Sequence, residues 1–280
     1  MTQTANPLKQ FFRQPALYLK LPSDGQFWAE GSIDMPPNKE LPILPMTAID
    51  EITYRTPDAL FNGSAIVSVI QSCVPNIKDA WKIPAVDLTT ILIAIRIATY
   101  NSEMEISSTC PACNSNGEYT LDLHTMIAGI GKADFSKAIK QGDLEVFFRS
   151  VDYQTQNQLN AQQFEQQRII QSISNSTETE DEKLTKLNGA LKAVTGITIA
   201  AISNSIAGIR TPNAFVTEPE FIIDFLKNCD RTLFGTIRDH AVQLRELSEL
   251  PPIPVTCTEC NHQYTQTITL DSTNFFEVAS

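Results

Sequence analysis

The N-terminal part of the chain alternates apolar and polar positions in the manner of β-strands. In ALYLKL, at residues 16–21, three leucines alternate with other side chains, which predicts a half-buried strand. A turn-forming PSDG follows, and QFWAEGSI at 26–33 is predicted to resume as a strand. The prolines of LPILPMT, at 41–47, restrict that segment to an edge strand or a loop. Residues 1–56 are therefore expected to form an N-terminal β region.

The pattern changes to a helical period over residues 57–102. Thr56-Pro57-Asp58 is typical of a helix start, and apolar residues then recur every three or four positions until Pro75. A second helix opens near Asp87 and is apolar on nearly all sides. We therefore expect a helix pair whose second member is buried or lies in an interface.

Residues 126–252 predict a mostly helical insertion. Its predicted elements are a short helix at 133–141, a strand at 144–151, and helices at 154–174, 180–206 and 222–247. The last is the most regular, and about 30 residues of helix would reach roughly 45 Å. Narrow apolar stripes with polar backs suggest a helical hairpin or three-helix arm that projects from the rest of the protein. The alternative is a compact helical subdomain with no binding role of its own.

The composition is that of a folded protein with an acidic surface. The 280 residues are 42% hydrophobic and 19% charged, enough for one large domain or two smaller ones. The net charge of −11 argues against a broad phosphate-binding surface, because nucleic-acid affinity depends on basic residues. The start lacks a signal peptide's apolar core, and the most apolar run, at 88–98, is far shorter than the roughly 20 residues that span a bilayer. We therefore expect a soluble chain from a reducing cytosol, where paired cysteines more often bind metal than form disulfides.

One short motif occurs twice, far apart in the chain. TCPACNSNGEYT at 109–120 and TCTECNHQYT at 256–265 both read Thr-Cys-x-x-Cys-Asn, and then Tyr-Thr. Two Cys-x-x-Cys turns supply the four thiolates that tetrahedral Zn²⁺ prefers. Asn114 and Asn261 follow the second cysteine of each motif, where tolerance of left-handed backbone suits a tight turn. The predicted ligands of one structural Zn²⁺ are Cys110, Cys113, Cys257 and Cys260.

The segments around the two motifs predict a split zinc ribbon. The predicted strands are 104–108 and 118–123 around the first motif, and 253–256 and 263–270 around the second. In a simple ribbon about 15–20 residues separate the two pairs, so the longer gap here must hold the insertion. The predicted fold class is α+β, with N-terminal strands, two helices, and a four-cysteine ribbon at 103–125 and 253–280 that the helical insertion interrupts.

Other interpretations of these residues stay open. The two cysteine pairs could be unrelated turns, or one could be a redox pair, although a redox pair normally joins a strand to a helix. His262 could replace a ligand, but we expect it to lie on the hairpin outside the metal. His124 is predicted to end a strand, and His240 to pack on its helix. Arg96 either extends its charge to the surface, which we favour, or pairs with an acid such as Asp50 or Glu51. Cys73 and Cys229 lie on apolar helix faces and are expected in the core.

No catalytic constellation is visible in the sequence. It contains no phosphate-binding Gly-x-x-x-x-Gly-Lys-Ser/Thr, no Gly-x-Gly-x-x-Gly, no His-Glu-x-x-His and no Gly-x-Ser-x-Gly. Four thiolates also leave no open coordination position, so the predicted zinc is structural. We expect no enzyme activity and no small-molecule substrate. Pattern and composition alone therefore predict a zinc-containing α+β protein that binds other proteins.

A longer stretch of the sequence carries a family resemblance. PALYLKLPSDGQFW, LPILPMTAIDEITYRTPDALFNGSAIVSVIQSCVPNIKDAW and IPAVDLTTILIAIRIATY before CPAC, within residues 15–113, resemble the baseplate hub assembly family of T4-like contractile-tailed bacteriophages. The second cysteine motif fits as well. The resemblance implies a structural or assembly component of the baseplate hub, without catalytic residues.

The implied partners are other phage tail and baseplate proteins or further copies of the chain, with no nucleic acid and no membrane. The implied location is the host cytoplasm during assembly and then the virion tail baseplate. The alternative function is a zinc-ribbon nucleic-acid-binding or regulatory protein, which the net charge of −11 disfavours.

Overall fold

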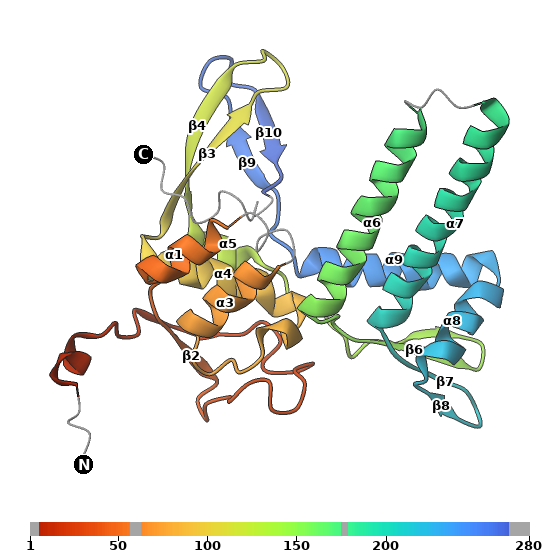
Figure 1. Cartoon of the computed structure of the whole chain (residues 1–280), viewed down its shortest axis with the longest axis horizontal. Helices are drawn as coiled ribbons and strands as arrows, with labels where there is room; N and C mark the ends of the chain where they lie inside the picture. Colours follow the sequence, from red (N-terminus) through yellow and green to blue (C-terminus); the bar gives the residue numbers. More distant parts are fainter. Residues whose placement is uncertain (1–5, 57–62, 175–178, 269–280) are drawn as a thin grey trace. The chain divides into compact units, whose positions relative to one another are not determined.

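The computed structural model describes residues 6–56, 63–174 and 179–268. The chain divides into two compact units. The first unit comprises residues 1–80, 87–130 and 250–280, and the second comprises 81–86 and 131–249. Small sheets and helices occur in both units (Figure 1), which confirms the predicted α+β class.

A short antiparallel β pair opens the first unit. β1 (Leu17–Lys20) pairs with β2 (Glu40–Ile43), which confirms the strand predicted at 16–21. The segment predicted as an edge strand or a loop at 41–47 is a strand as far as Ile43 and irregular from residue 44 to residue 47. Alternation along the strands buries one set of side chains, because successive residues face opposite sides. The buried residues of the pair are Leu19, Leu41 and Ile43.

The strand predicted at 26–33 is wrong. Residues 22–27 and 30–31 form turns, and within the expected strand Phe27 and Gly31 have φ angles of 68° and 75°. Extended backbone requires negative φ, so these two left-handed residues interrupt the strand. Within this segment Ile33 makes a single β-bridge, to Ile77.

Three α-helices follow the β pair in the described chain. They are α1 (Ala48–Tyr54), α3 (Ser64–Cys73) and α4 (Ala85–Thr99), with the short 3-10 helix η2 (Ala80–Lys82) before α4. Helices α3 and α4 bury most of their apolar side chains. Residues 90–96 of α4 are all buried, as its apolar sequence predicts. Arg96 belongs to this run and is only 7% exposed, so the expectation that it extends to the surface is wrong. Its guanidinium carbon lies 5.5 Å from the centre of the Tyr100 ring.

The start of the helix pair differs from the prediction. The expected start at Thr56-Pro57-Asp58 falls largely outside the described residues, and the described helix begins after Gly63, whose φ is 80°. Helix α1 was not predicted at all. Its signal is a capping box, in which Thr47 Oγ1 accepts from the Asp50 N–H while the Asp50 carboxylate accepts from Thr47.

Two β-hairpins carry the cysteine motifs of the first unit. β3 (Glu103–Thr109) pairs with β4 (Asn116–Asp122), and β9 (Ile253–Thr256) pairs with β10 (Gln263–Gln266). These strands confirm the predicted flanks with shorter ends: the last strand stops at Gln266, residues 267 and 268 are irregular, and residues 269 and 270 lie outside the described part. Helix α5 (Leu123–Gly129) follows β4 directly, because Asp122 caps it by accepting from the His124 N–H. His124 therefore lies in a helical turn and does not end a strand.

The second unit combines a small sheet with four helices. The sheet has the order β5-β6-β7-β8, all antiparallel, and its strands are β5 (Ile139–Gln141), β6 (Leu144–Phe148), β7 (Ile206–Arg210) and β8 (Phe215–Val216). Its helices are α6 (Tyr153–Ser174), α7 (Glu180–Ser205), α8 (Pro219–Asn228) and α9 (Arg231–Leu247). The buried core of this unit consists of Val146, Phe148, Ile202, Ile206, Ile209, Ile222, Leu226, Leu233, Ile237 and Leu244.

Two predictions within this unit are wrong. The helix expected at 133–141 is instead an irregular segment that ends in β5, which turns into β6 through Gly142 with a φ of 59°. The continuous helix expected at 222–247 is broken, because Asp230 leaves helical geometry and its carboxylate caps a new helix through the N–H groups of Thr232 and Leu233. The strand at 144–151 and the helices at 154–174 and 180–206 are confirmed, except that the strand ends at Phe148 and the last helix ends at Ser205, before strand β7.

Candidate metal centre

The four motif cysteines meet between the two hairpins of the first unit. Cys110 Sγ lies 3.7 Å from Cys260 Sγ, and Cys113 Sγ lies 3.7 Å from Cys257 Sγ. All four sulfur atoms lie within 4.8 Å of one another. Each close pair joins one cysteine of the first motif to one of the second, so both hairpins contribute equally to the cluster.

The same backbone turn positions the thiols in both motifs. In the first motif the Asn114 N–H donates to the Cys110 carbonyl at 2.9 Å, and Asn114 has a φ of 58°. In the second the Asn261 N–H donates to the Cys257 carbonyl at 3.0 Å, and Asn261 has a φ of 57°. The predicted left-handed asparagines are therefore confirmed, and they turn the chain so that both thiols of a motif face the same point.

The N–H of the first cysteine completes each turn. The Cys110 N–H donates to the Ser115 carbonyl, and the Cys257 N–H donates to the His262 carbonyl, each at 2.9 Å. If Cys110 is exchanged with Cys257 and Cys113 with Cys260, the Cys110–Cys260 pair becomes the Cys113–Cys257 pair. The cluster therefore has approximate two-fold symmetry, which accounts for the repetition of the motif in the sequence.

The tyrosines of the repeat hold the two hairpins together beside the cluster. Tyr119 and Tyr264 each precede the threonine that ends their motif, and a hydrogen bond between them raises the pKa of Tyr119 to about 12. Ser108 Oγ lies 2.9 Å from the Tyr264 hydroxyl and donates to Gln266 Oε1 at 2.7 Å. A Tyr-Thr pair at the end of each motif was visible in the sequence, but its role in joining the hairpins was not inferred from it.

The donor set fits a tetrahedral metal ion. Sulfur atoms placed about 2.3 Å from a central Zn²⁺ in a tetrahedron are about 3.8 Å from one another. The two close sulfur pairs, at 3.7 Å, match this edge length, and the full set stays within 4.8 Å. The four thiols are therefore compatible with a metal site, and their identity as zinc ligands stays a prediction.

The protonation of the thiols is linked across the cluster. The Ser115 hydroxyl, 3.4 Å from Cys257 Sγ, contributes most to lowering the pKa of Cys257 to about 6. The backbone contact with His262 lowers the pKa of Cys260. Hydrogen bonds with Cys113, Cys257 and Cys110 together raise it by more, so the net pKa is raised to about 12. Cys257 therefore forms a thiolate readily at neutral pH, while Cys260 retains its proton. A divalent cation would displace the protons that remain, because metal ligation requires all four thiolates.

The ribbon itself contains little apolar core. Four of its residues in 103–122 and 253–268 are buried, namely Ser108, Cys110, Val255 and Cys257. Val255 is the one aliphatic side chain among them. Close packing therefore cannot account for the association of the hairpins, and the thiol cluster with its neighbouring hydrogen bonds must hold them together.

The remaining sequence candidates lie away from the cluster. His262 is exposed and stacks on Tyr264, with the ring centres 6.3 Å apart. His240 packs edge-on against Phe148 in the core of the second unit, as predicted. Cys73 is fully buried at the end of α3, and Cys229 is half-buried beside the core of the second unit, as expected of core cysteines.

One buried polar group was missed by the sequence interpretation. The Asp87 carboxylate in the first turn of α4 is fully buried and accepts from Ser23 Oγ at 2.6 Å and from Trp28 Nε1 at 2.9 Å. Burial raises the pKa of Asp87 despite these hydrogen bonds. The carboxylate thereby fixes the turn segment onto α4, which is a structural role.

Comparison with known proteins identifies the family of the chain. Within the described residues, none of the helices is both long enough and apolar enough to cross a membrane. Searches of curated proteins and of solved structures return no match. A family described as T4 bacteriophage base plate protein matches residues 38–277, a span that includes both cysteine motifs and the whole second unit. The chain therefore belongs to the T4 bacteriophage base plate protein family.

Proposed function

We propose that this base plate protein is a structural or assembly component of the hub at the centre of a contractile phage tail. The family match over residues 38–277 carries this proposal, because it covers most of the chain and indicates a structural protein of the virion tail that interacts with other tail proteins. The resemblance of residues 15–113 to hub assembly proteins supports the hub in particular. The protein would assemble in the host cytoplasm and act without catalysis.

Zinc would serve this function as a structural ion. The four thiols at the hairpin tips come from segments that precede and follow the second unit, so one ion would join chain segments separated by more than a hundred residues. An ion in this position would fix the two ends of the second unit next to each other. The observation that supports Zn²⁺ is the match between the 3.7 Å sulfur pairs and tetrahedral thiolate geometry.

The second unit supplies surface for protein contacts. Helices α6 and α7 form an antiparallel hairpin (Figure 1), and this hairpin leaves large apolar side chains exposed. The exposed residues are Phe164 at 48%, Ile169 at 37%, Leu184 at 58% and Leu191 at 50%. Apolar side chains left uncovered on a folded unit commonly mark a protein contact. We therefore assign the helical insertion, residues 126–252, a role in binding neighbouring tail proteins.

Incorporation into tails tests the proposed function. Purified tails from infected cells should contain this chain in a fixed ratio to other baseplate proteins when analysed by quantitative mass spectrometry. An assembly factor would instead be present on tail intermediates and depleted from finished particles. If the chain were found on neither, the proposed hub role would be wrong.

Removal of the second unit tests its contribution. Gly129 and Pro251 are neighbours in space, because a Cβ atom placed on Gly129 would lie only 3.2 Å from the Pro251 ring. A short Gly/Ser linker can therefore join the two chain ends that remain when residues 131–249 are removed. We expect the shortened chain to keep its four-cysteine cluster and to fail in the assembly of complete tails. Normal infectious particles made with the shortened chain would show that the second unit makes no essential contact.

A further inference from the structure

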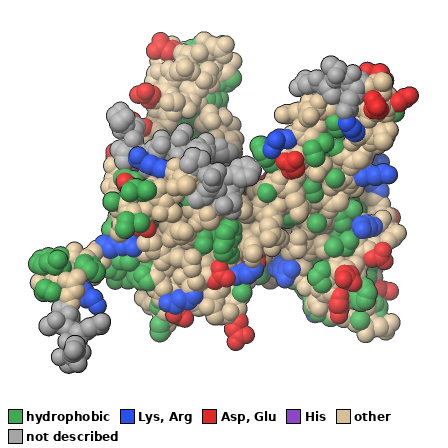
Figure 2. Space-filling view, in the orientation of Figure 1, with side chains coloured by type: hydrophobic (Ala, Val, Ile, Leu, Met, Phe, Trp, Pro, Cys, Tyr) green, Lys and Arg blue, Asp and Glu red, His purple; other side chains and the backbone are tan. Residues whose placement is uncertain are grey.

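The ribbon that carries the thiol cluster has no basic residue of its own. Residues 103–122 and 253–268 contain neither Lys nor Arg. Their acidic residues are Glu103, Glu105, Glu118, Asp122 and Glu259. Acidic side chains and no basic ones are visible on the tip of the ribbon in Figure 2. Four thiolates around one Zn²⁺ also leave two excess negative charges at the cluster. The ribbon therefore has to stabilise a negatively charged cluster without a cation of its own.

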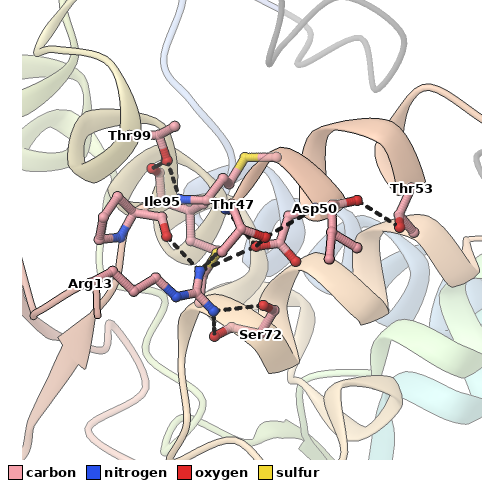
Figure 3. Close-up of polar contacts among 11 residues, drawn as sticks. Arg13, Thr47, Asp50, Thr53, Ser72, Ile95 and Thr99 are labelled. Atoms are coloured by element: carbon pink, nitrogen blue, oxygen red, sulfur yellow. Dashed lines mark hydrogen bonds and ion pairs between the residues drawn. The ribbon is translucent and has the colours of Figure 1, made fainter. Parts of the chain in front are cut away.

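Elsewhere in the first unit a buried carboxylate has a cation as its partner. Arg13 Nη1 donates to Asp50 Oδ2 at 3.2 Å, and Arg13 Nη2 donates to the hydroxyl and the carbonyl of Ser72 at 2.7 Å (Figure 3). In the ribbon, the thiolates depend instead on neutral N–H and O–H donors. Hydrogen bonds to an ionised acceptor are shorter and stronger than those between neutral groups, so each such donor matters for the charge of the cluster.

The backbone donates to the sulfur atoms in the same way in both motifs. Ser115 and His262 occupy the same place in the two motifs, two residues after the second cysteine. The Ser115 N–H donates to the Cys113 sulfur, and the His262 N–H donates to the Cys260 sulfur. A difference between the two motifs at this position must therefore come from the side chains.

The side chains at this position do differ. Ser115 Oγ lies 2.9 Å from Cys113 Sγ and 3.4 Å from Cys257 Sγ, so it contacts one thiol of each motif. Thiolates that bind a metal carry no proton, so the hydroxyl is the donor, and its single hydrogen is directed to the nearer sulfur, that of Cys113. The His262 ring is instead exposed and stacks on Tyr264. The approximate two-fold symmetry of the cluster is therefore broken at this position.

We propose that Ser115 is a positioning residue of the metal centre, whose hydroxyl donates to the Cys113 thiolate and increases the affinity of the site for Zn²⁺. This inference rests on the proposed structural zinc. Groups that hydrogen-bond to metal ligands commonly change metal affinity by about 10–100-fold. The ribbon contains no Lys or Arg that could take over the stabilisation of charge, so loss of the hydroxyl is not compensated within it.

The zinc affinity of the full-length chain tests this role. Competition with a chromophoric chelator measures the affinity. Ser115→Ala should weaken zinc binding by about tenfold or more, whereas Ser115→Thr keeps a hydroxyl and should retain the original affinity. His262→Ala is the matched control, because it changes the equivalent position, keeps the backbone N–H and removes a ring that stacks away from the sulfur atoms. It should leave the affinity unchanged.

The absorption spectrum of the Co²⁺-loaded chain separates a hydrogen bond to sulfur from a general loosening of the ribbon. A thiolate that loses a hydrogen bond gives up electron density more readily. The sulfur-to-cobalt charge-transfer band of Ser115→Ala should therefore shift to lower energy, and that of Ser115→Thr should not. The ligand-field bands, which report the number and arrangement of the sulfur ligands, should keep their positions in both variants.

The possible failures of the two proposals can be told apart. An original chain that binds neither Zn²⁺ nor Co²⁺ would overturn the zinc site and the role of Ser115 together. A Ser115→Ala chain with unchanged zinc affinity or an unshifted charge-transfer band would overturn the role of Ser115 alone. So would an equal loss of affinity in His262→Ala, because the effect would then belong to the turn and not to the hydroxyl.

Discussion

The ribbon of the first unit and the core of the second unit are held together by different means. In the second unit, ten buried apolar side chains from strands and helices pack into one cluster. In the ribbon, the described residues bury a single aliphatic side chain, Val255, beside two cysteines and a serine. The fold of the second unit is therefore stabilised by hydrophobic burial, while the ribbon depends on its thiols and on a few polar contacts.

This difference determines how each region should respond to perturbation. Hydrophobic burial is distributed over many side chains, so the loss of one leaves most of the second unit's core in place. The cluster of Cys110, Cys113, Cys257 and Cys260 is a single point of attachment for two hairpins. Failure of that point should separate segments distant in sequence, and the predictions below are ordered by the size of the expected effect.

Loss of the metal should produce the largest effect. A structural zinc site contributes on the order of 10 kcal/mol to folding, so Cys257→Ser or a strong chelator should greatly accelerate hydrogen exchange in both hairpins at once. The second unit should keep its protection. Cys229→Ser is the matched control, since Cys229 lies outside the cluster. Uniform acceleration over the whole chain, or none, would contradict the contrast between the two regions.

Truncation in the apolar core should reverse the pattern. Ile237 is fully buried in the second unit, so Ile237→Ala should lower the free energy of unfolding of that unit by about 2–5 kcal/mol. Chemical denaturation measures this change. Bound metal, read by atomic emission, should remain as in the original chain. A loss of metal together with the loss of stability would show that the two regions are not separable in this way.

The capping boxes of α1, which uses Asp50, and of α7, which uses Glu182, extend the comparison to electrostatics. Burial raises the pKa of Asp50. Hydrogen bonds with Thr47 and Ser72 and the charge of Arg13 together lower it by more, so the net pKa lies below its ordinary value of 3.8. A depressed carboxyl pKa stabilises the folded state above pH 3.8, and this contribution is lost as the pH falls through the folded-state pKa.

Asp50→Asn should therefore destabilise the first unit at neutral pH by about 1.5–3 kcal/mol, the usual range for hydrogen bonds to a charged group. The difference from the original chain should shrink on acidification below pH 3.8. Glu182→Gln is the matched control, because Glu182 caps α7 from an exposed position through Thr179. A pH-independent difference would contradict the assigned role of the carboxylate.

The smallest effect is expected from the hydrogen bond between the hairpins. Tyr264→Phe removes the hydroxyl that lies 2.9 Å from Ser108 Oγ, which should cost about 1 kcal/mol. The loss should appear as faster exchange in the ribbon alone. Tyr18→Phe on β1, where the side chain is 63% exposed, should have no such effect. Equal effects from both variants would argue against a specific contact between the hairpins.

The sequence predicted those parts of the fold in which chemistry or periodicity is local. The cysteine motifs specify both the ligand number and the turn, and the left-handed Asn114 and Asn261 confirm the turn. The apolar run of α4 predicts its burial directly. These inferences succeed because each depends on a few adjacent residues.

The failures occur where a short polar signal overrides periodicity. Asp230 divides the helix expected at 222–247, because its carboxylate caps a new helix although the apolar stripe continues across the break. Turns replace most of the strand expected at 26–33 for a similar reason, since Phe27 and Gly31 have left-handed backbone. The sheet of the second unit depends on the pairing of β6 with β7, which lie before and after the long helices α6 and α7, so no local pattern predicts it.

X-ray absorption at the zinc edge tests the central claim most directly. The purified full-length chain should contain one zinc ion per copy, with four sulfur neighbours at about 2.3 Å, because all four motif thiols meet at one point. A chain that is folded without metal, or a zinc ion with fewer than three sulfur neighbours, would contradict the account of the ribbon.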